Sequence, residues 1–206
     1  AMWEHQRRRR AAVIAGHESE VVWMLEHEPT ITTGRRTVPD LPSAERLNAE
    51  GIELFHTERG GLATYHGPGQ LMVYAIVNCW ERGLGAKMAV RTMERAILDW
   101  MLELGIMARR RDGFPGIWVG TDKIAAIGMH FSQGVSMHGA AIYLEGGSRG
   151  FDMITPCGVT NGGLTSIKGQ LGSSPSAAEA APVFVAHLIR NLDDPECLRP
   201  CRDDAS

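Results

Sequence analysis

The sequence lacks long apolar runs, a cysteine-rich pattern and an excess of positive charge. No stretch of its 206 residues approaches the roughly 20 consecutive apolar residues that cross a bilayer, so we expect no membrane association. A net charge of -3 argues against a general nucleic-acid-binding protein, whose surface is usually strongly basic. Four cysteines are too few for a disulfide-stabilised scaffold, which predicts a protein of the reducing cytoplasm.

Two ligand-binding signatures are also missing. The sequence has no GxxxxGK[ST] motif, the glycine-rich loop that holds nucleotide phosphates in many proteins. Cys197 and Cys201 are closely spaced, but they lie in a polar segment without a second pair of ligands at zinc spacing. We therefore expect no metal site and interpret this cysteine pair as non-functional.

What is present is an ordinary globular composition, with 44% apolar and 22% charged residues. The length fits one domain, and no repeat or linker divides the chain, so residues 1–206 are predicted to form a single domain. From about residue 193 the chain is polar, and we expect a frayed tail there. Arginine runs at 7–10 and 109–111 are typical of solvated faces, although either could steer an acidic partner.

Apolar patterning predicts both strands and helices. Strands are expected at 21–26, 52–55 and 71–77, the last two buried, with a loop at 28–37 and further loops around 56–70. Three more strands are expected over 117–144, joined by tight turns at 120–122 and 132–134.

The clearest helix is predicted at 86–104, where Val90, Met93, Ile97 and Met101 recur at three- and four-residue steps. A short helix at 43–50 begins after Ser43, and the last helix begins with a capping box formed by Ser176 and Glu179. Together these elements predict an α+β fold, a mixed and largely antiparallel sheet with flanking helices.

Three glycine-rich segments stand out from ordinary loops, and the first is RGGLATYHGPGQ at 59–70. Its glycines would let the backbone approach a ligand closely and offer N–H groups as donors. Arg59 and His66 bracket this loop. The alternative is a glycine-rich hairpin with an incidental histidine, and the segment alone does not decide.

The second segment, TDKIAAIGMHF at 121–131, places Lys123 at the start of a mostly apolar strand. A lysine in this position is commonly a solvated charge at the edge of a sheet. Alternatively its amine faces a cleft, where burial disfavours the charged form and lets the amine act as a base.

The third segment, ITPCGVTNGGLTS at 154–166, places Cys157 between a rigid proline and a permissive glycine. Such a sharp turn could present the thiol and hold an oxyanion with backbone N–H groups. A free cysteine is more often a small buried apolar residue, and a nucleophilic one needs a partner that generates the thiolate. The candidate partners are His66, Lys123, His130 and His138, and the residues alone do not choose among them.

The blocks RGGLATYHGPGQ, KIAAIG, MHGAAI and PCGVTNGGLTS, in this order, resemble the signature blocks of the lipoyl (octanoyl) transferases. The stretch LEHEPTITTGR at 25–35 resembles the upstream block of that family. Together they cover most of residues 21–167, and separate blocks in one order make a specific match. The resemblance implies the α/β fold shared by the biotin and lipoate protein ligases.

The resemblance also implies an activity and its partners. Members of this family transfer an octanoyl group from acyl carrier protein to a lysine of lipoyl-bearing domains. These acceptors occur in 2-oxoacid dehydrogenases and in the H protein of the glycine cleavage system. A thioester donor supplies the energy for amide formation, so no ATP and no cofactor are expected. We also expect a monomer that binds no nucleic acid.

Motif by motif, the family's nucleophile maps to Cys157 and its acid/base partner to Lys123, with the sulfur expected within about 4 Å of the amine. The substrate-binding positions map to Arg59, Gly60, Gly61, Thr64, His66, Gly67, Gly128, His138 and Gly139.

These positions predict a narrow apolar channel that ends near Cys157. Its walls would be the HGPGQ loop, the strand that begins at Lys123 and the HGAA strand, and its expected lining includes Leu62, Ile127 and Ala140. His66 and His138 are expected at its mouth as neutral hydrogen-bonding groups. At about 0.8 kcal/mol per buried methylene, such a channel would favour medium acyl chains over acetyl by several kcal/mol.

The chain departs from the family pattern at Tyr143, where asparagine is expected after the HGAA block. The family also usually has a further strand before the point where this sequence begins. Three other functions remain open. One is a biotin or lipoate protein ligase, which activates a free acid with ATP and needs no cysteine in the PCG block. The others are an amidase-type transferase that moves lipoyl groups and a non-catalytic carrier-binding protein.

Overall fold

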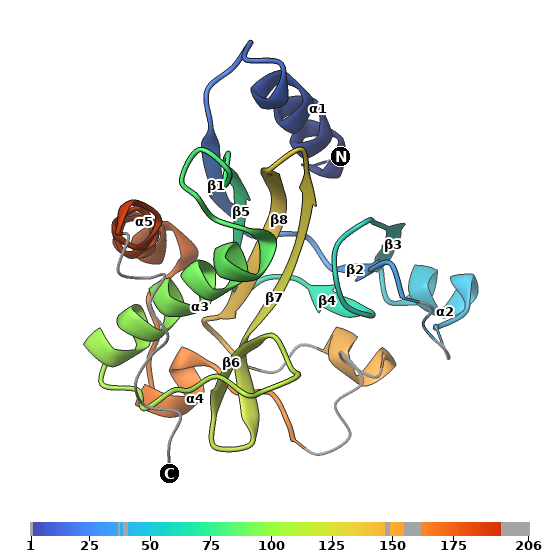
Figure 1. Ribbon diagram of the computed structural model, residues 1–206. Helices are drawn as coiled ribbons and strands as arrows, with labels where there is room; N and C mark the ends of the chain where they lie inside the picture. Colours follow the sequence, from blue (N-terminus) through green and yellow to red (C-terminus); the bar gives the residue numbers. More distant parts are fainter. Residues whose placement is uncertain (1, 37, 39–40, 147–148, 155–161, 195–206) are drawn as a thin grey trace.

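The molecule is built on a five-stranded antiparallel sheet with the strand order β1-β5-β8-β7-β6 (Figure 1). The structure is a computed structural model that describes residues 2–36, 38, 41–146, 149–154 and 162–194. The strands of this sheet are β1 (Val21–Leu25), β5 (Gln70–Ile76), β6 (Gly116–Val119), β7 (Asp122–Ser132) and β8 (Val135–Tyr143).

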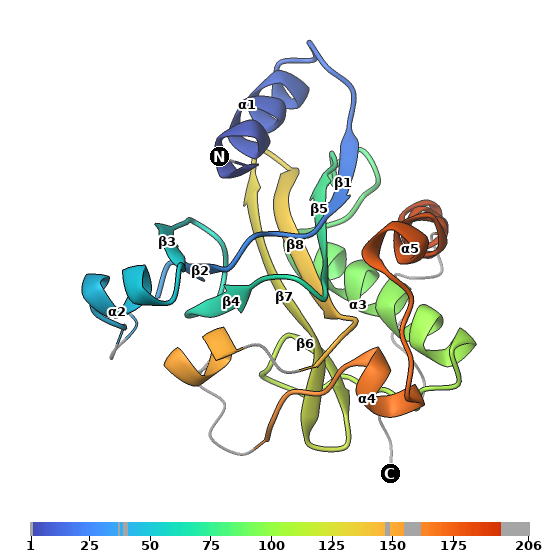
Figure 2. The same cartoon turned by 180° about the vertical axis from the view of Figure 1, so that it is seen from behind.

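Two long helices cover one face of this sheet. They are α3 (Ala86–Glu103) and α5 (Ala177–Asp193), which pack against each other (Figures 1 and 2). The odd-numbered residues of β5, such as Leu71 and Val73, point toward them into the largest apolar cluster. The capping box of Ser176 and Glu179 is present at the start of α5. The predicted helix at 86–104 and the three predicted strands over 117–144 are confirmed.

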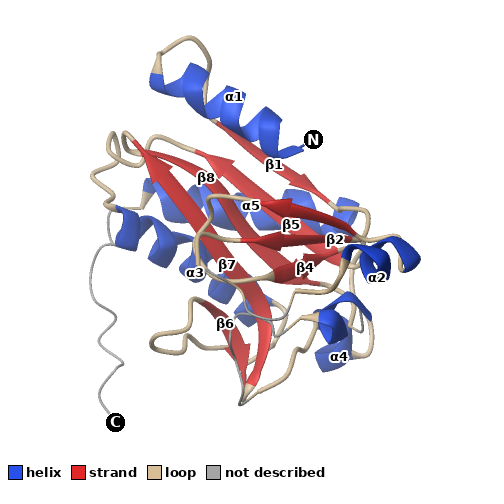
Figure 3. Cartoon of the chain, turned by 90° about the vertical axis from the view of Figure 1, so that its right-hand side faces the viewer, coloured by secondary structure: helices blue, strands red, loops and turns tan. Residues whose placement is uncertain are grey.

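The opposite face carries an N-terminal helix and a small sheet. The helix is α1 (Met2–Ile14), and the small sheet has the order β3-β2-β4, with β2 (Thr30–Thr33), β3 (Glu53–His56) and β4 (Thr64–His66). Strand β2 runs parallel to β3 and antiparallel to β4. Figure 3 shows β2 and β4 in front of the large sheet, with α3 and α5 behind it. The even-numbered residues of β5, Met72, Tyr74 and Ile76, face this side.

Short helical turns complete the fold. Helix α2 (Ala44–Ala49) begins as predicted after Ser43, whose hydroxyl accepts a hydrogen bond from the backbone N–H of Arg46. Helix α4 (Ile167–Leu171) and the 3-10 turn η1 (Arg149–Met153) were not expected from the sequence. Among the described helices, none is both long and apolar enough to cross a membrane.

Two local predictions are wrong and helix α1 was not predicted, and each of these differences has a physical cause. The segment 28–37 is not all loop, because Thr30–Thr33 pairs with β3 and β4, and this pairing is non-local. Strand β3 is only half-buried, since it pairs with β2 alone and lies at the edge of the small sheet. Helix α1 carries no apolar stripe for periodicity to detect, although arginine, alanine and glutamine favour helix.

Close backbone packing explains the glycine of the HGAA block, Gly139. A Cβ atom on Gly139 would collide with the carbonyl oxygen of Val73, across the pairing of β8 with β5. This glycine therefore has a structural reason as well as the functional one expected from its motif.

Candidate active site

Lys123 is buried at the point where β6, β7 and the chain after residue 161 meet. Only 4% of the residue is exposed, and its Nζ lies 4.7 Å from the centroid of the Trp118 ring, on the paired strand β6. An aromatic face at this distance stabilises an ammonium ion, whereas burial stabilises the neutral amine. Lys123 is therefore not the solvated strand-edge charge that the sequence left open.

The end of the PCGVTNGGLTS block is hydrogen-bonded to the start of β7. The N–H of Lys123 donates to the carbonyl of Gly163 at 3.0 Å, and the N–H of Thr165 donates to the carbonyl of Lys123 at 3.0 Å. The Asp122 carboxylate also accepts a hydrogen bond of 2.8 Å from the N–H of Gly163. These contacts anchor Gly163 and Thr165 beside the lysine.

Gly162 shows why this sequence contains glycine at the junction. Its φ of +144° lies in a region that L residues rarely adopt, and a Cβ there would collide with the carbonyl oxygen of Thr121. Cys157 and the rest of residues 155–161 lie outside the described residues, as do Cys197 and Cys201. The expected distance between the Cys157 sulfur and the Lys123 amine therefore stays a prediction.

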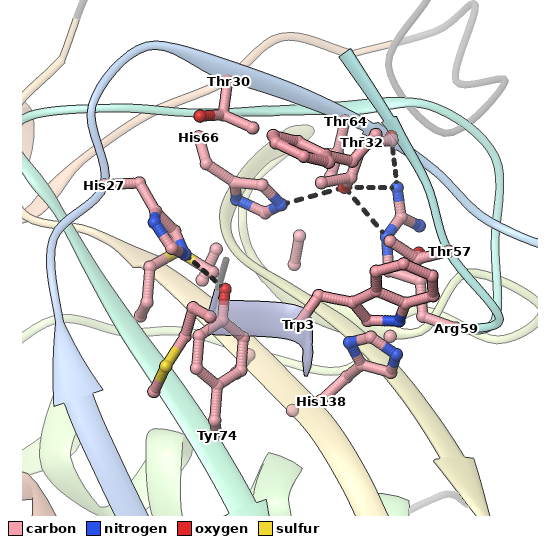
Figure 4. A pocket seen from close by; sticks show the side chains of 18 of the residues that line it. Trp3, His27, Thr30, Thr32, Thr57, Arg59, Thr64, His66, Tyr74 and His138 are labelled. Atoms are coloured by element: carbon pink, nitrogen blue, oxygen red, sulfur yellow. Dashed lines mark hydrogen bonds between the residues drawn. The ribbon is translucent and has the colours of Figure 1, made fainter. Parts of the chain in front are cut away.

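A cavity of about 420 Å³ opens between the large sheet, the small sheet and α1 (Figure 4). Of the substrate-binding positions expected from the motifs, eight line this cavity: Arg59, Gly60, Gly61, Thr64, His66, Gly128, His138 and Gly139. Gly67 and Lys123 do not line it, although Ala126, Ile127 and Gly128, further along the strand of Lys123, do. Folding thus brings together residues that are up to 80 positions apart.

The cavity is less apolar than the predicted channel. Ile127 and Ala140 line it as expected, but Leu62 does not. The side facing the small sheet is polar, with the hydroxyl-bearing or imidazole-bearing residues Thr30, Thr32, Thr57, Thr64, His27 and His66. The prediction differs here because the sequence predicts a loop at 28–37, so the inward-facing threonines of β2 are not among the expected lining residues.

Arg59 fixes the wall between the small sheet and the glycine-rich loop. Its guanidinium donates to the carbonyl oxygen of Thr32 at 2.6 Å, to the hydroxyl of Thr32 at 3.0 and 3.1 Å, and to the carbonyl oxygen of Gly60 at 3.0 Å. Arg59 is 7% exposed, so its positive charge acts on neighbouring groups with little solvent screening.

His66 and His138, two of the three histidines that line the cavity, are neutral at physiological pH. Burial, assisted by the positive charge of Arg59, lowers the pKa of His66 to about 3. Burial likewise lowers the pKa of His138 to about 4, and the Glu58 carboxylate, which opposes this shift, lies 3.8 Å from its Nε2. Among the described residues, no three histidine, cysteine, aspartate or glutamate side chains are grouped so as to hold a metal ion.

His138 is held in a strained backbone conformation. Its φ is +63°, a left-handed value that is uncommon for a residue other than glycine. Its buried N–H donates to Oε1 of Gln6, on α1, at 2.9 Å. Its Nε2 is buried and has no hydrogen-bond partner among the described residues. A conformation of this kind persists where the surrounding structure imposes it, and here the Gln6 contact and the pairing with Met129 on β7 both hold His138.

Several cavity residues were missed by the sequence argument. His27 and Tyr74 line the cavity and share a hydrogen bond of 2.7 Å, and Trp3 and Gln6 reach it from α1. The block at 25–35 contained a signal for His27, but nothing in the sequence pointed to α1. Tyr143, at the position of the expected asparagine, is not among the lining residues, and its ring packs edge-on against Phe151.

The neutral histidines predict that acid destabilises the protein. A folded pKa below the unfolded value of about 6.5 means that stability is complete above that pH and is lost as the pH falls. As the pH falls from roughly 6 to 4, each histidine of this kind should lower the free energy of unfolding by about 1.4 kcal/mol per pH unit. His66→Gln should reduce this slope by about that amount, measured by urea unfolding at several pH values.

The exposed His17 provides the matched control, since His17→Gln should leave the slope unchanged. His27 and His130, whose pKa values are also lowered by burial, contribute to the slope of the wild type and of both variants. The difference between wild type and His66→Gln therefore isolates His66. An identical slope in the two proteins would contradict a buried, neutral His66.

The amino-acid sequence is similar to those of known enzymes along most of its length. The sequence pattern of the lipoyl protein ligase A/B catalytic domain matches residues 2–189. An octanoyltransferase of Chloroflexus aurantiacus is 37% identical over 193 residues, which cover 91% of this chain and 86% of the relative. An octanoyltransferase of Roseiflexus sp. is 38% identical over 196 residues, covering 93% and 82%.

Solved structures confirm the fold expected from the motifs. The bi-partite lipoate protein ligase of Thermoplasma acidophilum superposes with a TM-score of 0.65 at 14% identity, covering 91% of this chain and 79% of that one. Lipoate-protein ligase A bound with ATP gives a TM-score of 0.57 at 18% identity, covering 89% and 74%. With its sequence relatives, its cavity and its fold in agreement, the chain belongs to the lipoyl protein ligase A/B catalytic domain family and, within it, to the octanoyltransferases.

Proposed function

We propose that this protein transfers an octanoyl group from acyl carrier protein to a lysine of lipoyl-bearing domains, through a thioester on Cys157. The acceptors would be the lipoyl domains of 2-oxoacid dehydrogenases and the H protein of the glycine cleavage system. The observation that carries the proposal is the burial of Lys123 beside Gly163, which belongs to the PCGVTNGGLTS block. The likeness to octanoyltransferases at 37–38% identity supports the identity of the acyl group.

In the first half-reaction, the neutral amine of Lys123 takes the proton of the Cys157 thiol. The thiolate attacks the carbonyl carbon of the donor thioester, and a tetrahedral intermediate forms. When the bond from that carbon to the carrier sulfur breaks, the Lys123 ammonium protonates the departing thiolate. The face of Trp118, 4.7 Å from Nζ, favours Lys123 while it carries this proton.

In the second half-reaction, the neutral amine of the acceptor lysine attacks the same carbonyl carbon. Lys123 removes the extra proton from the attacking nitrogen, and the bond to the Cys157 sulfur breaks. The proton returns from Lys123 to the cysteine thiolate. One thioester is consumed and one amide is formed, so the reaction needs neither ATP nor a redox partner.

The cavity supports this assignment because it combines an apolar wall with polar groups. Met72, Ala126 and Ala141, which pack in one apolar cluster on this face, form a strip across three neighbouring strands of the large sheet. An eight-carbon chain buried along this strip would gain about 0.8 kcal/mol for each methylene removed from water. Neutral histidines suit such a site better than charged ones, because a buried charge beside an acyl chain is costly.

The test supplies two donors to the purified protein together with a lipoyl domain that lacks its modification. We expect octanoyl-acyl carrier protein to modify the acceptor lysine without ATP, as detected by mass spectrometry of the lipoyl domain. Free octanoate with ATP and Mg²⁺ should give no modification. Modification only from the free acid with ATP would instead establish the ligase activity that the related fold also supports.

The location, the oligomeric state and the domain count of this protein are inferred from its sequence alone. A cytoplasmic location, a monomeric state and a single domain over residues 1–206 stay predictions.

A further inference from the structure

The first turn of α1 forms part of the cavity wall. Met2, Trp3 and Gln6 all line the cavity, and Gln6 is only 2% exposed. Figure 4 shows the Trp3 indole beside His138 and near Arg59. A helix that otherwise carries four consecutive arginines thus contributes one large aromatic ring to the site.

The indole of Trp3 is held in place from several directions. Its Nε1 donates a hydrogen bond of 2.6 Å to Oε2 of Glu58, in the loop after β3. The guanidinium of Arg7 lies over the ring, 5.1 Å from its centroid. Glu58 also forms ion pairs of 3.9 Å with Arg7 and 3.8 Å with Arg10. These contacts give the Trp3 side chain a defined position in the cavity wall.

The position of α1 along the sheet shows which end of the cavity it closes. Along β7, the cavity is lined by Ala126, Ile127 and Gly128, and each strand residue advances about 3.3 Å away from Lys123. Gln6 meets β8 at His138, which pairs with Met129, and Arg10 meets β7 at His130, with 2.6 Å between Nη1 and Nδ1. Helix α1 therefore lies at the end remote from Lys123.

We propose that Trp3 closes this remote end of the cavity and thereby sets the longest acyl chain that the enzyme accepts. This inference rests on the proposed function, in which the reacting carbonyl lies at the end near Lys123. Each additional methylene that fits the cavity should improve transfer roughly fourfold. A methylene that reaches the indole must displace a ring fixed by Glu58 and Arg7, so the gain should stop and reverse there.

The experiment compares octanoyl, decanoyl, dodecanoyl and tetradecanoyl groups on the same carrier protein, supplied in competition. The measured quantity is the ratio of dodecanoyl to octanoyl transfer to the acceptor domain. We expect Trp3→Ala to raise this ratio at least about tenfold, because its truncation lengthens the cavity. Trp3→Phe retains most of the ring and should raise the ratio much less.

Trp23 supplies a matched control for general damage to α1. It packs in the same apolar cluster as Trp3, under the face of α1, but it does not line the cavity. Trp23→Ala should lower the stability of the protein and leave the ratio unchanged. If Trp3→Ala fails to fold, Trp3→Leu tests the same expectation with a side chain that preserves apolar packing.

The outcomes separate this inference from the proposed function. Wild-type protein that transfers none of the four acyl groups would refute the function itself. Wild-type activity with octanoyl, combined with an unchanged ratio in the folded Trp3 variants, would overturn the role of Trp3 and leave the function intact. A ratio raised equally by Trp23→Ala would also overturn it, since the effect would then not come from the cavity wall.

Discussion

Replacing Cys157 with serine is expected to reduce octanoyl transfer by about a thousandfold or more, while the protein folds normally. A hydroxyl is a far weaker nucleophile than a thiolate, and a factor of this size corresponds to about 4 kcal/mol of transition-state stabilisation. The measurement is the steady-state rate with octanoyl-acyl carrier protein and an unmodified lipoyl domain. Circular dichroism and thermal unfolding of the variant should match those of the wild type.

Cys79 offers the matched control for this substitution. It is a buried free cysteine in a separate apolar cluster between the sheet and α3, and burial raises the pKa of its thiol. Cys79→Ala should therefore retain activity, even if the variant is less stable. Turnover by Cys157→Ser close to the wild-type rate would show that transfer does not pass through this sulfur.

Replacing Lys123 is expected to cost on the order of 10²–10⁴-fold in kcat, the range typical of a general acid–base residue. Lys123→Arg keeps a positive charge but cannot release a proton in the working range, and Lys123→Met keeps the stem without the amine. Both should lose activity if the proton relay matters. If only the charge mattered, Lys123→Arg would stay active and Lys123→Met would not.

The measurement is kcat as a function of pH for wild type and both variants. Lys168 provides the control lysine, because it is exposed on α4 and forms a surface ion pair of 3.0 Å with Glu145. Lys168→Met should change kcat little, since surface ion pairs contribute about 0–1 kcal/mol. Full activity of both Lys123 variants would remove the residue from the mechanism.

Local sequence patterns were sufficient for the elements whose signals are local. The apolar repeat around Met93 and Ile97 predicted α3, the Ser43 cap predicted the start of α2, and the turns at 120–122 and 132–134 predicted the hairpins of the large sheet. Each of these patterns reports on contacts within a few residues or across a tight turn.

The small sheet and α1 could not be found in this way. Strand β2 pairs with β3 more than 20 positions further along the chain, and Thr30–Thr33 is too short to show a period of its own. Helix α1 is positioned by apolar residues near its two ends and by individual polar contacts, such as the one between Gln6 and the N–H of His138. Such contacts between distant segments leave no pattern in one sequence.

The same distinction applies to the site. The resemblance of the glycine-rich blocks to those of the family implied Arg59, His66 and His138, which the fold brings to one cavity. Trp3, in contrast, lies more than 50 positions from Glu58, its hydrogen-bond partner, and belongs to none of the blocks. Tyr143 replaces the asparagine expected in the family pattern. Its ring packs against Phe151, and the residue does not line the cavity.

The central claim is that the octanoyl group passes through a thioester on Cys157, and the trapped enzyme tests it most directly. The protein is incubated with octanoyl-acyl carrier protein without acceptor, digested at mildly acidic pH and analysed by peptide mass spectrometry. We predict one octanoyl group on the peptide that contains Cys157, and its loss when the lipoyl domain is added. Octanoylated acceptor that accumulates while Cys157 stays unmodified at every time point would contradict the account.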